Sequence, residues 1–231
     1  MKKGIVIALD GPAGSGKSTI ARAVALKFNY IYIDTGAMYR AVTLKALQNK
    51  IPVDNHSELT RLALNTLILL KYIETDGLSQ LRVIMDEVDV SDAIRSLEVT
   101  NNVSAVSAVA GVREALVGLQ RDMAREGGVV MDGRDIGTVV LPDAELKIFL
   151  TASVSERCKR RWLELKAKGV EVDPDELEEQ IKKRDLLDSN REVNPLRQAK
   201  EAILLDTTNL SIAEVTDQIV ELALTRGAEL F

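Results

Sequence analysis

Residues 5–18 read IVIALDGPAGSGKS, and this stretch decides the fold. Ile5–Leu9 is a short apolar run of the kind that forms a strand buried on both faces. Gly11 to Ser18 match the Walker A pattern of Gly, four residues, Gly, Lys and Ser or Thr. The glycines let the loop turn its amide hydrogens inward around a polyphosphate, and the positive end of the following helix attracts the same anion. The sequence therefore predicts a nucleotide-phosphate site after the first strand.

Two side chains of this loop have defined tasks in such a site. Lys17 reaches the β- and γ-phosphates, and the Ser18 hydroxyl is offered to Mg²⁺. We therefore expect ATP together with Mg²⁺ as the ligand. We assign the binding of ATP to nine consecutive residues: Gly11, Pro12, Ala13, Gly14, Ser15, Gly16, Lys17, Ser18 and Thr19.

Apolar runs and helical spacing alternate along the rest of the chain. The other strand-like runs are residues 31–33, 129–131, 146–150 and 202–205, and the helical stretches are 17–28, 38–48, 111–125, 153–168 and 211–225. This alternation predicts an α/β fold with a parallel sheet flanked by helices. Ser211 and Glu214 form a capping-box signature at the start of the last helix.

Two regions break the alternation. In residues 67–90, two β-prone runs flank Asp76-Gly77, and Asp-Gly is a hairpin signal. We predict a small antiparallel insertion at 59–96, which leaves 1–58 and 97–231 as the core. Residues 169–195 are dense in charge and are typical of a solvated helical hairpin.

Composition excludes several classes of protein. The chain has 231 residues with 46% hydrophobic residues and a net charge of −5, as in a soluble globular protein. Aromatic residues make up only 3%, so together with the acidic balance a nucleic-acid partner is disfavoured. One cysteine and one histidine allow neither an internal disulfide nor a zinc cluster. We expect a cytoplasmic protein with no secretion signal and no membrane span.

Phosphate-binding loops occur in several protein classes, and motifs that are missing narrow the choice. A GTPase needs Asn-Lys-x-Asp, but the only Asn-Lys pair, Asn49-Lys50, lies too early and is followed by Ile51-Pro52. The chain also lacks the Leu-Ser-Gly-Gly signature of transport ATPases. It is instead rich in arginines in or beside the predicted loops and the charged region: Arg40, Arg113, Arg134, Arg157, Arg161, Arg184 and Arg191. Guanidinium groups suit a transfer between two phosphorylated substrates, since they neutralise several negative charges at once.

Two motifs carry a resemblance. Residues 34–40 read DTGAMYR and residues 132–138 read DGRDIGT, and with them the chain resembles the bacterial cytidylate kinases, which are nucleoside monophosphate kinases. The resemblance runs essentially end to end and includes residues 112–116 and 184–191. It implies a P-loop kinase core of five parallel strands, a nucleotide-binding insertion and a helical lid at about 157–195. The implied reaction converts ATP and CMP or dCMP into ADP and CDP or dCDP. We expect a monomer, because a self-contained site of this kind functions readily without a partner chain.

The resemblance also implies where CMP binds. By similarity, Thr35, Ser104, Arg113 and Asp135 contact cytosine, Arg40, Arg134 and Arg191 the acceptor phosphate, and Arg184 and Asp188 the sugar, while Tyr39 belongs to the same site. The cytosine amine needs an acceptor such as Asp135, and its ring nitrogen and carbonyl need donors such as Arg113. Uracil reverses this pattern and leaves buried polar groups unpaired. Thr35 stands where some relatives carry Ser, so a methyl group is added to the pocket.

The acceptor is already an oxyanion, so no general base is expected. Catalysis then consists of positioning and charge neutralisation by Lys17, Mg²⁺ and arginines, with a lid that excludes water. Arg157 and Arg161 are four residues apart on a predicted helix and share a face. Asp132 is a candidate for holding Mg²⁺ through water, and Asp34 is the alternative. Residues 206–209 either contact adenine or only lead to the Ser211 cap.

Two other readings remain open at this point. The chain could be a P-loop kinase of another small acceptor, such as shikimate or dephospho-coenzyme A, which would not call for Arg113 and Asp135. It could also be a nucleotide-sensing or RNA-binding module that holds ATP without turnover. The net acidity and the arginine set argue against the second reading.

Overall fold

The computed structural model describes residues 4–75, 78–167 and 169–231. The chain divides into two compact units, which are taken here one at a time. The first unit consists of Met1–Ile33 and Met123–Phe231, and the second of Asp34–Asp122. The predicted boundaries of core and insertion, at 58/59 and 96/97, stay predictions.

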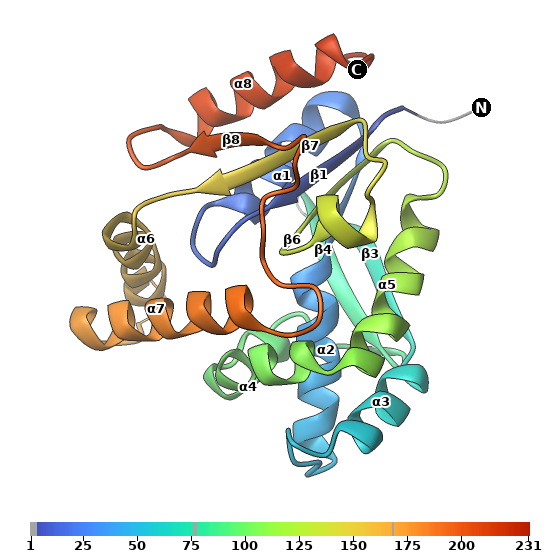
Figure 1. The fold of residues 1–231 in the computed structure, drawn as a ribbon, viewed down its shortest axis with the longest axis vertical. Helices are drawn as coiled ribbons and strands as arrows, with labels where there is room; N and C mark the ends of the chain where they lie inside the picture. The colour runs from blue at the N-terminus through green and yellow to red at the C-terminus, as the bar shows by residue number, and fades with distance from the viewer. Residues whose placement is uncertain (1–3, 76–77, 168) are drawn as a thin grey trace. The chain divides into compact units, whose positions relative to one another are not determined.

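The first unit is built on a parallel sheet, which within the described residues has five strands in the order β2-β6-β1-β7-β8 (Figure 1). The strands are β1 (Val6–Asp10), β2 (Ile31–Asp34), β6 (Val129–Gly133), β7 (Leu146–Thr151) and β8 (Ile203–Asp206). All residues of β1 and β6 are buried, as expected for strands covered on both faces. The predicted α/β fold is confirmed, and the loop after β1 leaves the sheet from its central strand.

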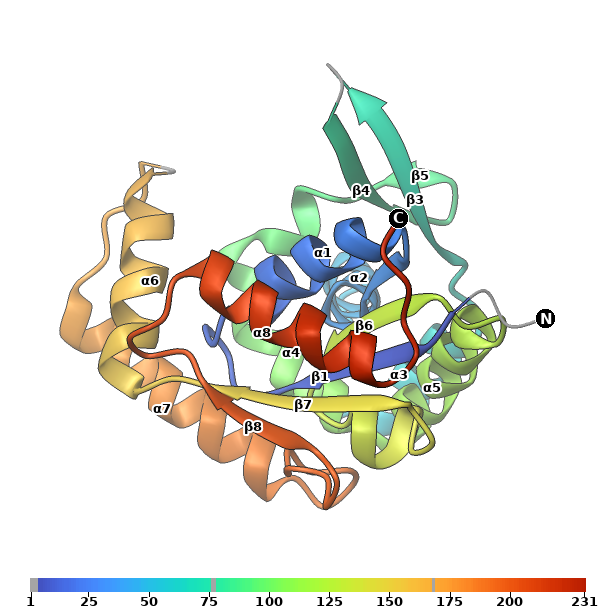
Figure 2. The same ribbon diagram turned by 90° about the horizontal axis from the view of Figure 1, so that it is seen from above.

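Helices complete the first unit. They are α1 (Lys17–Phe28), α6 (Val154–Ala167), α7 (Pro174–Asn190) and α8 (Ile212–Thr225), with a short π-helix, η2 (Ile136–Val140). Helices α1 and α8 pack side by side over the sheet (Figure 2). The predicted capping box at Ser211 and Glu214 is present. The charged region at 169–195 contains the single helix α7 and not the predicted helical hairpin, because Asp173 caps one continuous helix that runs to Asn190 and packs on α6.

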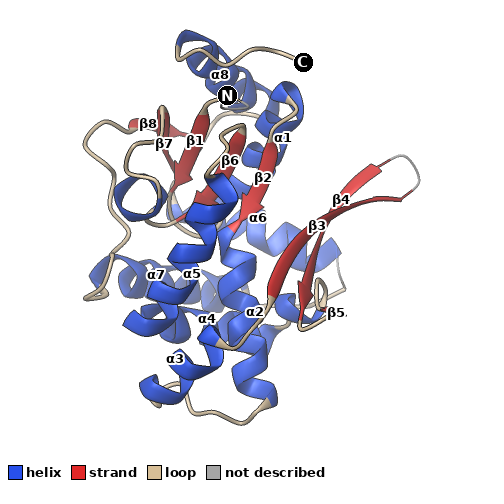
Figure 3. Ribbon diagram, turned by 90° about the vertical axis from the view of Figure 1, so that its right-hand side faces the viewer, coloured by secondary structure: helices blue, strands red, loops and turns tan. Residues whose placement is uncertain are grey.

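The second unit contains four helices and an antiparallel sheet within its described residues: α2 (Thr35–Gln48), α3 (His56–Leu64), α4 (Leu97–Ala108), α5 (Ala110–Ala124), β3 (Ile68–Thr75), β4 (Leu78–Met85), β5 (Val88–Asp89) and the 3-10 turn η1 (Ala93–Arg95). Strands β3 and β4 form a long ribbon (Figure 3). The antiparallel prediction is therefore correct, although the Asp76-Gly77 turn lies outside the described residues. Residues 59–64 are helical instead, because Leu59, Leu62 and Ala63 are spaced to bury one face of α3.

No single helix in the described ranges is long and apolar enough to cross a membrane. Helices α4 and α5 reach that length and hydropathy only together, and they meet at a bend of 94°.

Candidate active site

The Walker A loop connects β1 to α1 and depends on glycine conformations. Gly11, Gly14 and Gly16 have φ of 149°, 76° and 90°, which side chains rarely adopt. A Cβ on Gly11 would lie 2.0 Å from the Leu150 carbonyl oxygen, so the loop also passes too close to β7 for any side chain. The sequence motif and the local backbone therefore agree.

Lys17, in the first turn of α1, is buried within this loop. Its Nζ donates to the Pro12 carbonyl at 2.7 Å and to Ser15 Oγ at 3.3 Å. Burial lowers the pKa of Lys17 to about 7, and the positive charge of Arg134 acts in the same direction. The charge of Arg184 lowers it further, whereas Asp132 raises it. Three cationic side chains thus lie close enough to influence one another at the end of β1.

Ser18 and Asp132 are brought together from α1 and β6. Ser18 Oγ donates to Asp132 Oδ2 at 2.9 Å, and the Tyr32 hydroxyl donates to Asp132 Oδ1 at 2.9 Å. Asp34, the alternative Mg²⁺ candidate, caps α2 by accepting the Ala37 N–H at 2.9 Å. The geometry therefore favours Asp132 as the partner of Ser18. Tyr32 is not identified as a site residue from the sequence, because it lies in the middle of the apolar run 31–33 and is assigned there only to a strand.

Two ion pairs connect the segment after β6 with α7 and its C-terminal cap. Arg134 Nε contacts Asp188 Oδ2 at 2.7 Å, and Arg191 contacts Asp135 Oδ1 at 3.2 Å. Burial raises the pKa of Asp188, but the positive charges of Arg134 and Arg184 outweigh it and hold that pKa below its ordinary value. Four residues predicted to bind the acceptor nucleotide therefore form two adjacent pairs of opposite charge.

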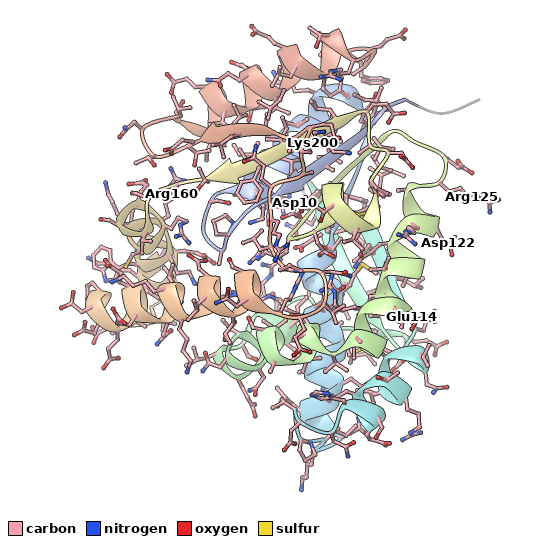
Figure 4. All side chains as sticks on the ribbon, viewed as in Figure 1. Asp10, Glu114, Asp122, Arg125, Arg160 and Lys200 are labelled. Atoms are coloured by element: carbon pink, nitrogen blue, oxygen red, sulfur yellow. The ribbon has the colours of Figure 1, made fainter. Side chains whose placement is uncertain are left out.

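Helix α6 places two arginines against the phosphate loop. Arg157 is buried, donates to the Ala13 carbonyl at 3.1 Å and pairs with Asp185 of α7 at 2.7 Å. Arg160, labelled in Figure 4, donates to Thr207 Oγ1 at 3.0 Å, and Thr207 in turn donates to the Ser15 carbonyl at 3.3 Å. Arg160 is not among the site residues predicted from the sequence, which include its neighbour Arg161 instead.

Arg161, the predicted neighbour, forms its ion pair within its own helix, whereas Arg157 pairs with a residue of α7. Arg161 contacts Glu164 at 2.6 Å, and nearly a third of its side chain is exposed. Its role in transfer stays a prediction.

The remaining predicted acceptor residues belong to the second unit. Arg113, on α5, is 2% exposed, donates to the Ser107 carbonyl at 3.1 Å and lies over the Tyr39 ring. Arg40, on α2, donates to Thr100 Oγ1 at 2.9 Å. Thr35 is the buried first residue of α2, and Ser104 lies on α4.

The cytidylate kinase family model matches residues 7–225. The chain belongs to the cytidylate kinase family. A cytidylate kinase of Enterococcus faecalis is 52% identical over 98% of this chain and 99% of its own length. A cytidylate kinase of Exiguobacterium sibiricum is 56% identical over 96% and 98%, respectively. A solved structure of an uncharacterized protein from Eubacterium ventriosum matches with a TM-score of 0.51 at 14% identity, covering 96% of this chain and 99% of that one, and so supports the fold alone.

Family membership confirms the expectation drawn from residues 34–40 and 132–138. Within the described residues, no cluster of three or more His, Cys, Asp or Glu side chains could hold a metal ion by itself. The Ser18 hydroxyl and the Asp132 carboxylate nevertheless supply oxygen atoms, the kind of group that Mg²⁺ prefers, and phosphates and water commonly complete the coordination of this ion. The chemistry of Ser18 and Asp132 therefore fits Mg²⁺.

Proposed function

We propose a division of the catalytic work between residues that bind ATP and residues that bind the acceptor nucleotide. The protein is an ATP-dependent kinase of CMP and dCMP. The observation that carries the residue assignment is the cationic group around the phosphate loop, in which the charges of Arg134 and Arg184 both lower the pKa of Lys17. Such a cluster of positive charge is unfavourable on its own and becomes favourable around a polyanion.

The donor half of the site uses residues 11–19. Their backbone N–H groups and the Lys17 ammonium bind the ATP phosphates, and Arg157 holds the loop through the Ala13 carbonyl. Ser18 and Asp132 would hold Mg²⁺, which neutralises charge on the β- and γ-phosphates when it is bound. Asp132 would act through water, since its Oδ1 already accepts from Tyr32.

The acceptor half uses residues that the protein keeps in charge pairs. Arg134 and Arg191 would bind the CMP phosphate, with Arg40 from α2, and Asp188 and Arg184 the sugar. Asp135 would accept from the cytosine amine, while Arg113, Thr35, Ser104 and Tyr39 complete the base site. The transferring group is neutralised by arginines, and Arg161 becomes one of them if α6 moves.

Uracil is the informative competitor because it places a carbonyl oxygen where cytosine has its amine. A carboxylate facing that oxygen is repelled by it and receives no hydrogen bond from the base, so UMP is a poor acceptor. Asp135→Asn supplies an amide that donates to this oxygen. We expect its ratio of kcat/KM for CMP to that for UMP to fall by about 100-fold.

The test measures Mg-ATP-dependent ADP formation with CMP, dCMP, UMP, AMP and GMP, and with no acceptor. Fast turnover with CMP and dCMP and slow turnover with UMP are expected. Thr43→Val, which removes a buried hydroxyl that donates to the Tyr39 carbonyl on the same helix, is the control and should keep the preference for CMP. An unchanged CMP-to-UMP ratio of kcat/KM in Asp135→Asn would contradict the base contact. ADP formation at the same rate with and without an acceptor would contradict the whole acceptor site.

A further inference from the structure

Asp10 is a buried carboxylate that the proposed function does not use. It is the last residue of β1 and the residue directly before Gly11, and it is 3% exposed. Figure 4 labels it at the end of the strand, where the phosphate loop begins. Its two oxygens have separate partners, because Oδ1 accepts the N–H of Ile136 and Oδ2 accepts the N–H of Gly137, each at 2.7 Å.

These two N–H groups belong to the residues that follow Asp135. One carboxylate that binds two consecutive N–H groups fixes both peptide planes, and the first of these planes is attached directly to the Asp135 Cα. Asp135 itself has φ −141° and ψ 29°, outside the helix and strand regions, so regular structure does not set its conformation. The backbone from which the Asp135 side chain projects is therefore held by Asp10, while Arg191 contacts the Asp135 carboxylate itself.

Neighbouring backbone and side chains restrict both Asp10 and the turn at Ile136 and Gly137 that it binds. Asp10 pairs with Gly133 in the β1–β6 ladder, which places the carboxylate beside the segment that continues β6. A Cβ on Gly137 would lie 3.4 Å from Asp10 Oδ2 and 3.3 Å from the Lys147 side chain, so the turn rests closely on the carboxylate. On the other side, Gly11 is confined by the Leu150 carbonyl.

We propose that Asp10 is a positioning residue for the acceptor nucleotide: through the N–H groups of Ile136 and Gly137 it holds Asp135 in the direction that reads cytosine. The inference rests on the proposed function, because it assumes that Asp135 contacts the base. Asp10 also begins the phosphate loop, so a single residue joins the backbone of the donor site to the base-reading segment of the acceptor site.

A purely structural role fits Asp10 less well. Burial raises the pKa of Asp10 to about 6 and outweighs the two N–H bonds, which lower it. The negative charge of Asp135 raises this pKa further, while Lys17 lowers it. A charged group is thus kept where the fold alone would prefer a neutral one, and such a cost is typical of functional positions.

The primary variant is Asp10→Asn, in which an NH₂ group faces one of the two N–H donors. We expect KM for CMP to rise by about tenfold or more and the CMP-to-UMP ratio of kcat/KM to fall by about tenfold, as for loss of one charge-assisted hydrogen bond. KM for ATP should stay within about twofold, because the phosphate loop keeps its backbone contacts. Equal changes in KM for CMP and for ATP, or an unchanged CMP-to-UMP ratio, would overturn the proposal.

The Asp135→Asn variant separates failure of this proposal from failure of the proposed function. If Asp135→Asn leaves the CMP-to-UMP ratio unchanged, the base contact itself is wrong, and the role of Asp10 is overturned with it. If Asp135→Asn lowers the ratio and Asp10→Asn does not, only the role of Asp10 is overturned. In the double variant, Asp10→Asn should add less than about twofold to the effect of Asp135→Asn on the ratio, because both act at one contact.

Two controls distinguish a general loss of folding from the loss of the Asp10 contact. Thr216→Val removes a buried hydroxyl that donates to the Ile212 carbonyl in α8, and it should lower the melting temperature with an unchanged CMP-to-UMP ratio. The amide protons of Ile136 and Gly137 report the contact directly, and their NMR resonances should move upfield in Asp10→Asn. If Asp10→Asn does not fold, Asp10→Ser is measured in its place with the same expected shift in the ratio. Failure of both variants to fold would assign Asp10 to the fold and overturn the proposal.

Discussion

At the scale of single residues, the charged side chains of the site differ in whether a partner of opposite charge offsets their burial. Lys17 is buried and lies near two other cations, so its ammonium is disfavoured and its pKa falls to about 7. Asp188 is buried as well and Arg134 is partly buried, but each has the other at 2.7 Å. Lys17 therefore gains more than Arg134 electrostatically when it meets a phosphate.

This difference predicts that ATP binding takes up a proton. At pH 8 most Lys17 side chains are neutral, and bound phosphates raise the pKa again, so we expect uptake of up to about one proton for each nucleotide. Calorimetry of a non-hydrolysable ATP analogue in two buffers of different ionisation enthalpy measures this number. The variant Lys17→Met should bind with little or no uptake, and equal uptake in the two proteins would contradict the assignment.

At the scale of elements, strands were predictable from apolar runs, but their last residues were not. The run 5–9 predicts a strand that stops before Asp10, yet β1 includes it, and β2 and β8 likewise end on Asp34 and Asp206. In each case backbone N–H groups satisfy the carboxylate: Asp34 and Asp206 accept from residues two or three positions further along the chain, whereas Asp10 accepts from a turn 126 residues away. Hydropathy shows none of these partners, and the partner of Asp10 depends on tertiary structure.

The same limit explains which site residues the sequence revealed. The residues 11–19 could be found because they form a local motif with a fixed spacing, and Asp132 became a candidate because it directly follows a strand-like run. Asp10 and Arg160 could not, because their partners are 126 and 47 residues away along the chain. Helix α2 also begins at Thr35, three residues before the predicted start, since Asp34 caps it.

Helices α6 and α7 form an element pair with an apolar cluster of its own. Cys158, Leu177 and Ile181 are buried there, and Trp162 packs against them. We predict that Ile181→Ala loosens this pair selectively, because the substitution removes three carbons from a small cluster that has few other contacts. Hydrogen exchange followed by mass spectrometry should show faster exchange in 154–190 and unchanged exchange in β1 and β6.

The matched control for this substitution is Ile219→Ala in α8. Ile219 is completely buried in the first unit, away from the α6–α7 cluster. Its truncation should lower the free energy of global unfolding by about 2–5 kcal/mol without selective exchange in 154–190. Faster exchange throughout the first unit in Ile181→Ala would show that α6 and α7 are not a separate cooperative element.

At the scale of the whole molecule, the placement of Asp10 has a consequence for stability. The folded state holds the Asp10 proton more tightly than the unfolded chain does, because its pKa is about 6 instead of 3.8. The stability that this proton contributes is fully present below pH 3.8 and is lost as the pH rises through 6. Asp10 therefore makes the protein less stable at the pH where its charge is available to hold Ile136 and Gly137.

Asp10→Asn removes this pH dependence, because an amide does not titrate in this range. We predict that the free energy of unfolding of Asp10→Asn, minus that of the wild type, increases between pH 4 and pH 8 by up to about 3 kcal/mol. Urea unfolding of both proteins at several pH values measures the difference, and Thr216→Val, which removes no titratable group, is the control that should show no such trend. A constant difference would mean that the carboxylate is not strained by burial. An increase would show that the molecule gives up stability at neutral pH to keep a charge at the junction of its phosphate loop and its base-reading segment.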